Sequence, residues 1–259
     1  MPPLLTIDIG NTTTSFVFFK DSHLDIILDK KTYLTSEIKA QKAKTMKFIY
    51  SFFKKNSNIS FNAIISSVVP SIDFLIKHIL DDVNTNSVVN LNDVRDIVIN
   101  IDRNCKKTIG SDRVANMAGA YNIYKKSVAV ADFGTATTIS VVNNEGKFIG
   151  SSIMPGINMM LNCIHKGTAK LPLIKADKVF QPYDIDTSSA IKTGVILGTT
   201  GAIERFIKDI EEARDCKLQL VLTGGSALLI SSFIKRSYEL NPNLIFEGLR
   251  VIYERNYNE

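Results

Sequence analysis

The chain has 259 residues, of which 45% are hydrophobic and 22% charged, enough for one large or two moderate domains whose core needs no disulfide or metal. Cys105, Cys163 and Cys216 show neither a C-x-x-C pair nor a spacing to histidine that suits zinc, which argues against a structural zinc site. No apolar run approaches the ~20 residues of a membrane span, and Asp8 stands where a signal peptide would be apolar, so we expect a cytoplasmic protein without membrane attachment. The net charge of +5 is spread along the whole chain, so we expect no nucleic-acid partner.

Strand and helix signals alternate in the first half of the chain. Short apolar runs predict strands over Leu4–Ile9 and Ser15–Lys20, joined by a turn at Gly10-Asn11-Thr12 into a hairpin that Leu24–Leu28 extends. The further elements predicted here are a helix over Glu37–Lys55, a strand over Asn62–Val69, a helix over Ser71–Leu80, and strands over Ser87–Leu91 and Asp96–Ile101.

The second half repeats this alternation. The predicted elements are a helix over Asp112–Tyr124, strands over Ser127–Asp132, Thr138–Val142 and Phe148–Ile153, helices over Gly156–His165 and Ser188–Ala213, a strand over Leu218–Thr223, a helix over Ser226–Arg236, and a tail. No segment is rich in proline or serine, so any domain boundary is a crossover and not a flexible linker.

The two halves share a ten-residue pattern. Asp8–Val17 aligns without a gap to Asp132–Val141, and Asp, Gly, Thr, Thr and Val recur at the same positions. The offset of 124 residues (132 − 8) is close to half the chain, which is typical of a duplicated domain. The sequence therefore predicts two α/β lobes that face each other across a cleft.

An aspartate that ends a buried strand, followed by a glycine turn and hydroxyl side chains, can bind phosphate. The glycine admits the backbone, N–H and hydroxyl groups donate to phosphate oxygens, and the carboxylate holds the accompanying cation. One copy is common in ordinary hairpin turns, but two copies favour a phosphate clamp. A P-loop is absent, and Gly194, Gly198 and Gly201 lack the G-x-G-x-x-G spacing, so we expect these three to permit close helix packing.

The segment Gly110–Arg113 stands at the predicted start of a helix. There Arg113 could fork onto a substrate carboxylate, and Asp112 could take a proton from a hydroxyl nucleophile. Taken alone, these residues fit an ordinary helix cap better.

Together these motifs resemble a known group of proteins. The paired Asp–Gly turns are similar to those of the actin, hexokinase and Hsp70 superfamily, and the chain specifically resembles type III pantothenate kinase. The matching segments, in chain order, are Asp8-Ile9-Gly10-Asn11-Thr12, Ser66-Ser67-Val68-Val69-Pro70, Gly110-Ser111-Asp112-Arg113, Asp132-Phe133-Gly134-Thr135-Ala136-Thr137, Met154-Pro155-Gly156, Thr168-Ala169-Lys170-Leu171-Pro172, Thr187 with Gly194, and Thr223-Gly224-Gly225. The resemblance implies two lobes of the actin-like, ribonuclease H-like type, each a mixed sheet with helices, at residues 1–110 and 111–259, with a nucleotide cleft between them.

The resemblance also implies an activity, the ATP-dependent phosphorylation of pantothenate to 4'-phosphopantothenate by a homodimer. Asp112 would be the general base, Asp8 would hold Mg²⁺ through water, and Asp132 would bind potassium or ammonium. The implied pantothenate contacts are Gly110, Ser111, Asp112, Arg113 and Thr187. The implied ATP contacts are Asp8, Ile9, Gly10, Asn11, Thr12, Thr13, Thr14, Ser15 and Thr135. The turn at Gly224-Gly225 could let the backbone close on the adenosine or be a plain turn.

Three positions depart from the family's pattern. Arg103 and Lys106 stand where many members carry tyrosine and proline, and Ser15 replaces a common lysine. Arg103 could add a second contact to the substrate carboxylate or point to solvent. Two alternatives therefore stay open: a nucleotide-binding regulatory protein without kinase activity, or a kinase or phosphatase of the same superfamily with another substrate.

Overall fold

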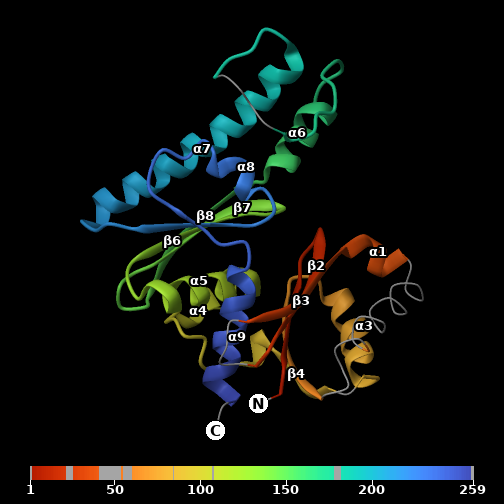
Figure 1. Ribbon diagram of the computed structural model, residues 1–259. Helices are drawn as coiled ribbons and strands as arrows, with labels where there is room; N and C mark the ends of the chain where they lie inside the picture. Colours follow the sequence, from red (N-terminus) through yellow and green to blue (C-terminus); the bar gives the residue numbers. More distant parts are fainter. Residues whose placement is uncertain are drawn as a thin grey trace. The chain divides into compact units, whose positions relative to one another are not determined.

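The computed structural model describes residues 2–21, 26–40, 54, 60–83, 85–106, 108–177 and 182–257, except for the side chains of residues 39, 40, 103 and 106. The chain divides into two compact units, Met1–Ile123 with Leu244–Glu259, and Tyr124–Asn243. Each unit contains one five-stranded sheet with helices packed on it (Figure 1). This confirms the predicted α/β class with two similar lobes. No helix in the described ranges combines the length and apolar character that a bilayer crossing requires.

The first unit is built on a mixed sheet in the order β3-β2-β1-β4-β5, in which β1 pairs antiparallel with β2 and parallel with β4. Its elements are β1 (Leu4–Ile9), β2 (Thr13–Phe19), β3 (Ile27–Leu34), α1 (Thr35–Ala40), β4 (Phe61–Ser67), α3 (Pro70–Asp81), β5 (Thr85–Asn90), the 3-10 turn η1 (Leu91–Asp93), α4 (Arg103–Lys106), α5 (Ser111–Tyr124) and α9 (Leu244–Tyr257).

The two faces of the first sheet are covered by different helices. Alternate residues of β1, including Ile7 and Ile9, join the core beneath α3, which contributes Ile72 and Ile76. Because successive side chains of a strand point to opposite faces, Asp8 belongs to the other face, on which α9 packs against β1 and β4. The fold therefore keeps Asp8 out of the apolar core.

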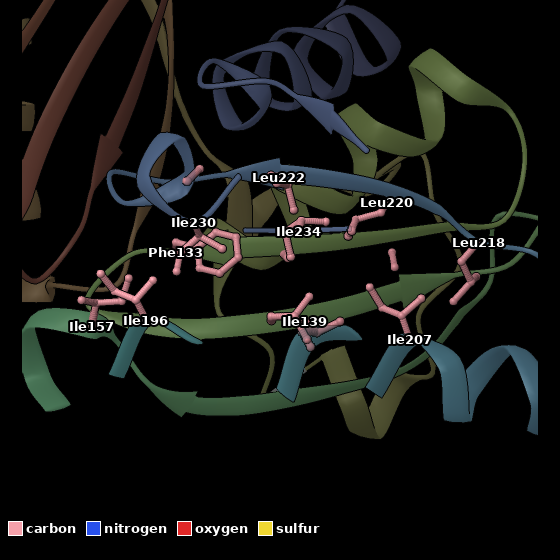
Figure 2. Close-up of a cluster of buried hydrophobic side chains, with 14 of the residues drawn as sticks. Phe133, Ile139, Ile157, Ile196, Ile207, Leu218, Leu220, Leu222, Ile230 and Ile234 are labelled. Atoms are coloured by element: carbon pink, nitrogen blue, oxygen red, sulfur yellow. The ribbon is translucent and has the colours of Figure 1, made fainter. Parts of the chain in front are cut away.

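The second unit repeats the plan with a sheet in the order β10-β9-β6-β7-β8. Its elements are β6 (Val128–Phe133), β7 (Ala136–Val142), β8 (Phe148–Pro155), α6 (Ile157–Lys166), α7 (Thr187–Arg214), β9 (Gln219–Thr223), α8 (Ala227–Ser231) and β10 (Glu239–Leu240). Figure 2 shows its core, where Phe133 and Ile139 of the sheet meet Ile196 and Ile207 of α7.

The strand topology confirms the duplication. The gapless alignment of Asp8–Val17 with Asp132–Val141, however, is wrong by one residue in the part that follows the turn. Both sheets place their first strand between an antiparallel and a parallel neighbour. Asp8 lies opposite Ser15 in the first hairpin, whereas Asp132 lies opposite Thr138 in the second. The second loop is therefore one residue shorter, and Ser15 corresponds in space to Thr138.

The strand predicted over Asp96–Ile101 is absent from the structure. The carboxylate of Asp96 accepts a hydrogen bond from the Val98 N–H (2.8 Å), and Val98 takes a left-handed conformation with φ of 72°. The side-chain amide of Asn256, on α9, donates to the Asp96 carbonyl (2.7 Å). A local side-chain turn and a long-range contact thus override the β-branched residues.

The predicted tail is also wrong, because it contains β10 and the 14-residue helix α9. A Cβ at Gly248 of α9 would overlap the Ala115 carbonyl of α5, and one at Gly119 would lie 2.7 Å from the Leu244 oxygen. The two helices therefore meet backbone to backbone. This packing groups α5 and α9 with the first sheet, whereas the predicted lobes, 1–110 and 111–259, assign both helices to the second.

Three smaller expectations also differ, and a fourth is tested only at its two ends. Helix α8 ends at Ser231, well before Arg236, and the third strand begins at Ile27, with residues 22–25 outside the described ranges. The helix predicted over Glu37–Lys55 is described over Thr35–Ala40 and at Lys54, and the rest lies outside the described residues. Three glycines of α7 were expected to permit close helix packing: Gly194, Gly198 and Gly201. All three are exposed, and a Cβ added at any of them would meet no described atom within 4 Å. The expectation of close packing is therefore wrong.

Glu211, near the end of α7, is hydrogen-bonded to Leu218, the residue before β9, and to Arg236. Its Oε1 accepts hydrogen bonds from the Leu218 N–H (2.9 Å) and from Arg236 Nη2 (2.7 Å). Burial alone would raise the pKa of Glu211, but these hydrogen bonds and the charges of Arg236 and Lys217 outweigh it and lower the pKa. A lowered pKa contributes stability above the unfolded-state value and loses it as pH falls through the folded-state value.

We therefore expect Glu211→Gln to lose about 1–2 kcal/mol of unfolding free energy at pH 7, since charge-assisted hydrogen bonds exceed neutral ones by about that amount. Urea unfolding at pH 7 and at pH 4 measures the unfolding free energies of variant and wild type. The difference between them should become smaller when the pH falls below the ordinary glutamate pKa of about 4.3. The control is Glu212→Gln, since Glu212 is 65% exposed and lies 3.7 Å from Lys208. A loss in Glu211→Gln that is no larger than in this control would contradict the expectation.

Candidate functional site

The first Asp–Gly turn is held in shape by hydrogen bonds from its own hairpin and from α1. The Gly10 N–H donates to the Thr13 carbonyl (2.9 Å), which closes the loop. The Thr35 N–H donates to the Thr12 carbonyl (2.9 Å), and the Thr35 hydroxyl donates to the Gly10 carbonyl (2.7 Å). Thr35 is 2% exposed, so it supports the turn from behind.

The residues of this turn fall into exposed and buried groups. Asn11, Thr12 and Thr13 are exposed at the tip. The buried Thr14 hydroxyl lies 3.1 Å from the Thr35 hydroxyl. Because the Thr35 hydroxyl donates its one hydrogen to the Gly10 carbonyl, Thr14 is the donor in this pair. The exposed tip is the part of the turn that can bind a phosphate, and the buried Thr14 stabilises the turn through its hydrogen bond to Thr35.

Asp8 lies within a row of polar side chains that crosses the first sheet. It is opposite Ser15 on β2 and opposite Ser66 on β4, and directly opposite residues point to the same face. Ser15 is hydrogen-bonded to the Thr32 hydroxyl of β3 (2.9 Å). The row stands near the carboxyl ends of parallel strands β1 and β4, where open α/β sheets bind ligands.

The start of α5 brings a carboxylate and a guanidinium to the same unit. The Asp112 Oδ1 accepts from the Arg113 N–H (2.8 Å), and the Val114 N–H donates to the Gly110 carbonyl (3.2 Å). A Cβ at Gly110 would overlap the Asp112 Oδ1, so a larger residue there would displace that carboxylate. Asp112 and Arg113 are half-buried at the electropositive end of a 14-residue helix. This pairing can hold an anionic substrate and accept a proton.

The second Asp–Gly turn is anchored by backbone groups. The Gly134 N–H donates to the Ala136 carbonyl (3.1 Å), and the Gly156 N–H donates to the Thr135 carbonyl (3.2 Å). Gly156 occupies the place that Thr35 has in the first unit, and a Cβ there would overlap the Gly134 and Thr135 carbonyls. Gly134 and Thr135 are exposed, so this turn also presents its tip.

Asp132 of the second unit is flanked in the same way as Asp8. It lies opposite Thr138 on β7 and Thr223 on β9, so hydroxyl residues again stand on both sides of the carboxylate. Gly224 follows Thr223 with φ of 92°, and a Cβ there would overlap the Asp132 carboxylate. Carboxylate and hydroxyl oxygens are ligands that hard cations prefer, so Asp132 fits a cation.

The predicted site residues divide between the two units. Asp8–Ser15 and Gly110–Arg113 lie in the first, and Asp132, Thr135 and Thr187 lie in the second. Thr187 is the exposed first residue of α7, preceded by the N-cap Asp186, whose carboxylate accepts from the Ser189 N–H (3.0 Å). Arg103 begins α4, and its side chain, like that of Lys106, lies outside the described structure.

Sequence reasoning missed three supporting residues. Ser66 and Gly156 lie inside the matching motifs, but no pattern assigned them a contact. Thr35 belongs to no motif, and its contact with Gly10 spans 25 residues. Only the pairing of β2 with β3, which places Leu34 opposite Thr13, could have indicated that Thr35 lies beside the turn.

Comparisons with known proteins agree with the motifs. A family model described as type III pantothenate kinase matches residues 4–209. The chain is 33% identical over 254 residues to a type III pantothenate kinase of a Sulfurihydrogenibium species, covering 95% of this chain and 97% of the relative. It is 32% identical to the Fervidobacterium nodosum protein of the same name, with 98% of both chains covered.

A solved structure from Campylobacter jejuni, described as a Baf family transcriptional activator, superimposes with a TM-score of 0.61 and 22% identity, over 98% of this chain and 100% of that one. At that identity the likeness shows the shared fold.

Proposed function

Because the chain belongs to the type III pantothenate kinase family, we infer that it catalyses the ATP-dependent phosphorylation of pantothenate, the first step of coenzyme A biosynthesis. The observation that supports this inference most is the extent of the match. Residues 4–209 include both Asp–Gly turns and the start of α5, so every predicted site residue lies inside the matched region. The relatives align over nearly their whole length.

The first turn is the proposed site of the ATP phosphates. Its tip, Asn11–Thr13, is exposed, and backbone N–H groups and hydroxyls are suitable donors to phosphate oxygens. Kinases of this kind use a divalent metal with ATP, and the Asp8 carboxylate fits such a cation because hard cations prefer oxygen ligands. Mg²⁺, held through water, would neutralise phosphate charge during transfer. Thr14 and Ser15, both buried, support the turn.

The start of α5 is the proposed site of pantothenate. Arg113 can form two parallel hydrogen bonds with the substrate carboxylate. One oxygen of Asp112 accepts from the Arg113 N–H, and the carboxylate can take the proton of the primary hydroxyl. The hydroxyl oxygen then bonds to the γ-phosphorus as the bond to ADP breaks. Gly110, Ser111 through its main chain, Thr187 and Arg103 complete the proposed substrate contacts.

The second turn is the proposed monovalent-cation site. Asp132 supplies a carboxylate, and Thr135, exposed at the tip, would reach ATP. Potassium or ammonium bound there would offset phosphate charge. We also propose a cytoplasmic homodimer, as is usual for the family that the motifs indicate. Light scattering tests the dimer, since a particle of one 28.8 kDa chain would contradict it.

The deciding experiment is pantothenate-dependent ADP release by the purified protein with Mg²⁺, with and without potassium or ammonium. We expect turnover only with pantothenate, and several-fold faster turnover with the monovalent cation. ATP binding without turnover would overturn the proposal and favour a regulatory protein. Turnover with another member of a panel of hydroxy acids would instead reassign the substrate.

A further inference from the structure

A chain of hydroxyl groups joins β4 to the start of α5. The Ser66 hydroxyl donates to the Ser111 hydroxyl (2.9 Å), and the Ser111 hydroxyl donates to the Ser67 carbonyl (3.0 Å). Each hydroxyl has one hydrogen, so the direction of the chain is fixed. Ser66 is fully buried and Ser111 is 4% exposed, so water does not compete for these hydrogen bonds.

Ser66 stands between the two halves of the first unit's site. On one side it lies opposite Asp8 in the parallel pairing of β1 with β4. On the other side its hydroxyl holds Ser111, the residue immediately before Asp112. A single buried hydroxyl therefore connects the strand position beside Asp8 to the segment that carries the proposed base.

We propose that Ser66 is a positioning residue that fixes the proposed base, Asp112, relative to the phosphate-binding turn at Asp8. This assignment rests on the proposed function. It also changes the role expected of Ser111, whose hydroxyl hydrogen is used inside the protein, so its side chain supports the site and does not donate to pantothenate. In the second unit Thr223, which is 3% exposed, takes the place of Ser66 beside Asp132.

The test compares Ser66→Ala with the matched control Ser87→Ala. Ser87 lies on β5 in the same unit, and its hydroxyl donates to Asn62 Oδ1 (3.1 Å) and lies 3.3 Å from the Tyr253 hydroxyl of α9. We expect Ser66→Ala to lower kcat about 10- to 100-fold, because small misplacements of reacting groups have effects of that size. The KM for ATP should change less than about threefold, because the turn itself keeps its contacts. Ser87→Ala should retain wild-type kcat.

Amide hydrogen exchange over residues 108–116 tests the same idea without substrates. Loss of one hydrogen bond predicts exchange about 3- to 10-fold faster in Ser66→Ala than in Ser87→Ala. Unchanged exchange, or equal kcat values in the two variants, would overturn the proposal for Ser66. Wild-type protein that shows no pantothenate-dependent turnover would overturn the proposed function instead, and the exchange measurement would still decide whether Ser66 holds the start of α5.

Discussion

Asp112→Asn should lower kcat by about 10²- to 10⁴-fold, the usual contribution of general base catalysis. The amide keeps an oxygen that can accept from the Arg113 N–H, which lies 2.8 Å from Asp112 Oδ1, so the start of α5 should keep its shape. What is lost is the ability to take the proton of the attacking hydroxyl. The measurement is pantothenate-dependent ADP release, with ATP affinity determined separately by calorimetry and expected to stay unchanged.

Asp29→Asn is the matched control for this variant. Asp29 Oδ1 accepts from the next residue's N–H, that of Lys30, at the same 2.8 Å, but lies on β3. We expect that control to keep wild-type turnover. Turnover near the wild-type rate in Asp112→Asn would remove Asp112 from the role of base. Equal losses in both variants would indicate a general effect of neutralising an aspartate in this unit.

Gly224→Ala should destabilise the second unit by at least about 2 kcal/mol, since a left-handed conformation alone costs an alanine about 1–2 kcal/mol. Gly224 has φ of 92°, and an added Cβ would lie 2.6 Å from the Phe133 nitrogen as well as against the Asp132 carboxylate. Backbone atoms cannot move aside as a flexible side chain can. Urea unfolding measures the loss, and a potassium titration of ADP release should show weaker activation because Asp132 is displaced.

The neighbouring residue provides the control for Gly224. Gly225 is exposed, and a Cβ there meets nothing within 4 Å in the described chain, so Gly225→Ala should change stability by less than about 1 kcal/mol. If Gly224→Ala is as stable as Gly225→Ala and keeps the potassium response, the close approach to Asp132 is not required.

Local chemistry determined much of this protein in advance. Strands β1 and β6 are short apolar runs that end in an aspartate and a glycine turn. That they are strands, and where they begin and end, therefore follows from residues close together in the sequence. The repeat of Asp8 at Asp132 predicted the duplicated plan, which the two sheet orders confirm. The motifs also indicated the family, because short segments in a fixed order survive even where the overall identity is 33%.

Tertiary structure decided what depends on contacts between distant residues. The stretch after Asp96 has β-branched residues, yet it forms no strand because its backbone is held by Asn256, 160 residues away. Helix α9 was expected to be a tail, and it is fixed by the glycine contact between Gly248 and α5. Ser66 meets Ser111 across 45 residues, and no periodicity within a segment reports such a meeting. Local patterns specify elements and turns, whereas the partners of a side chain depend on how the whole chain packs.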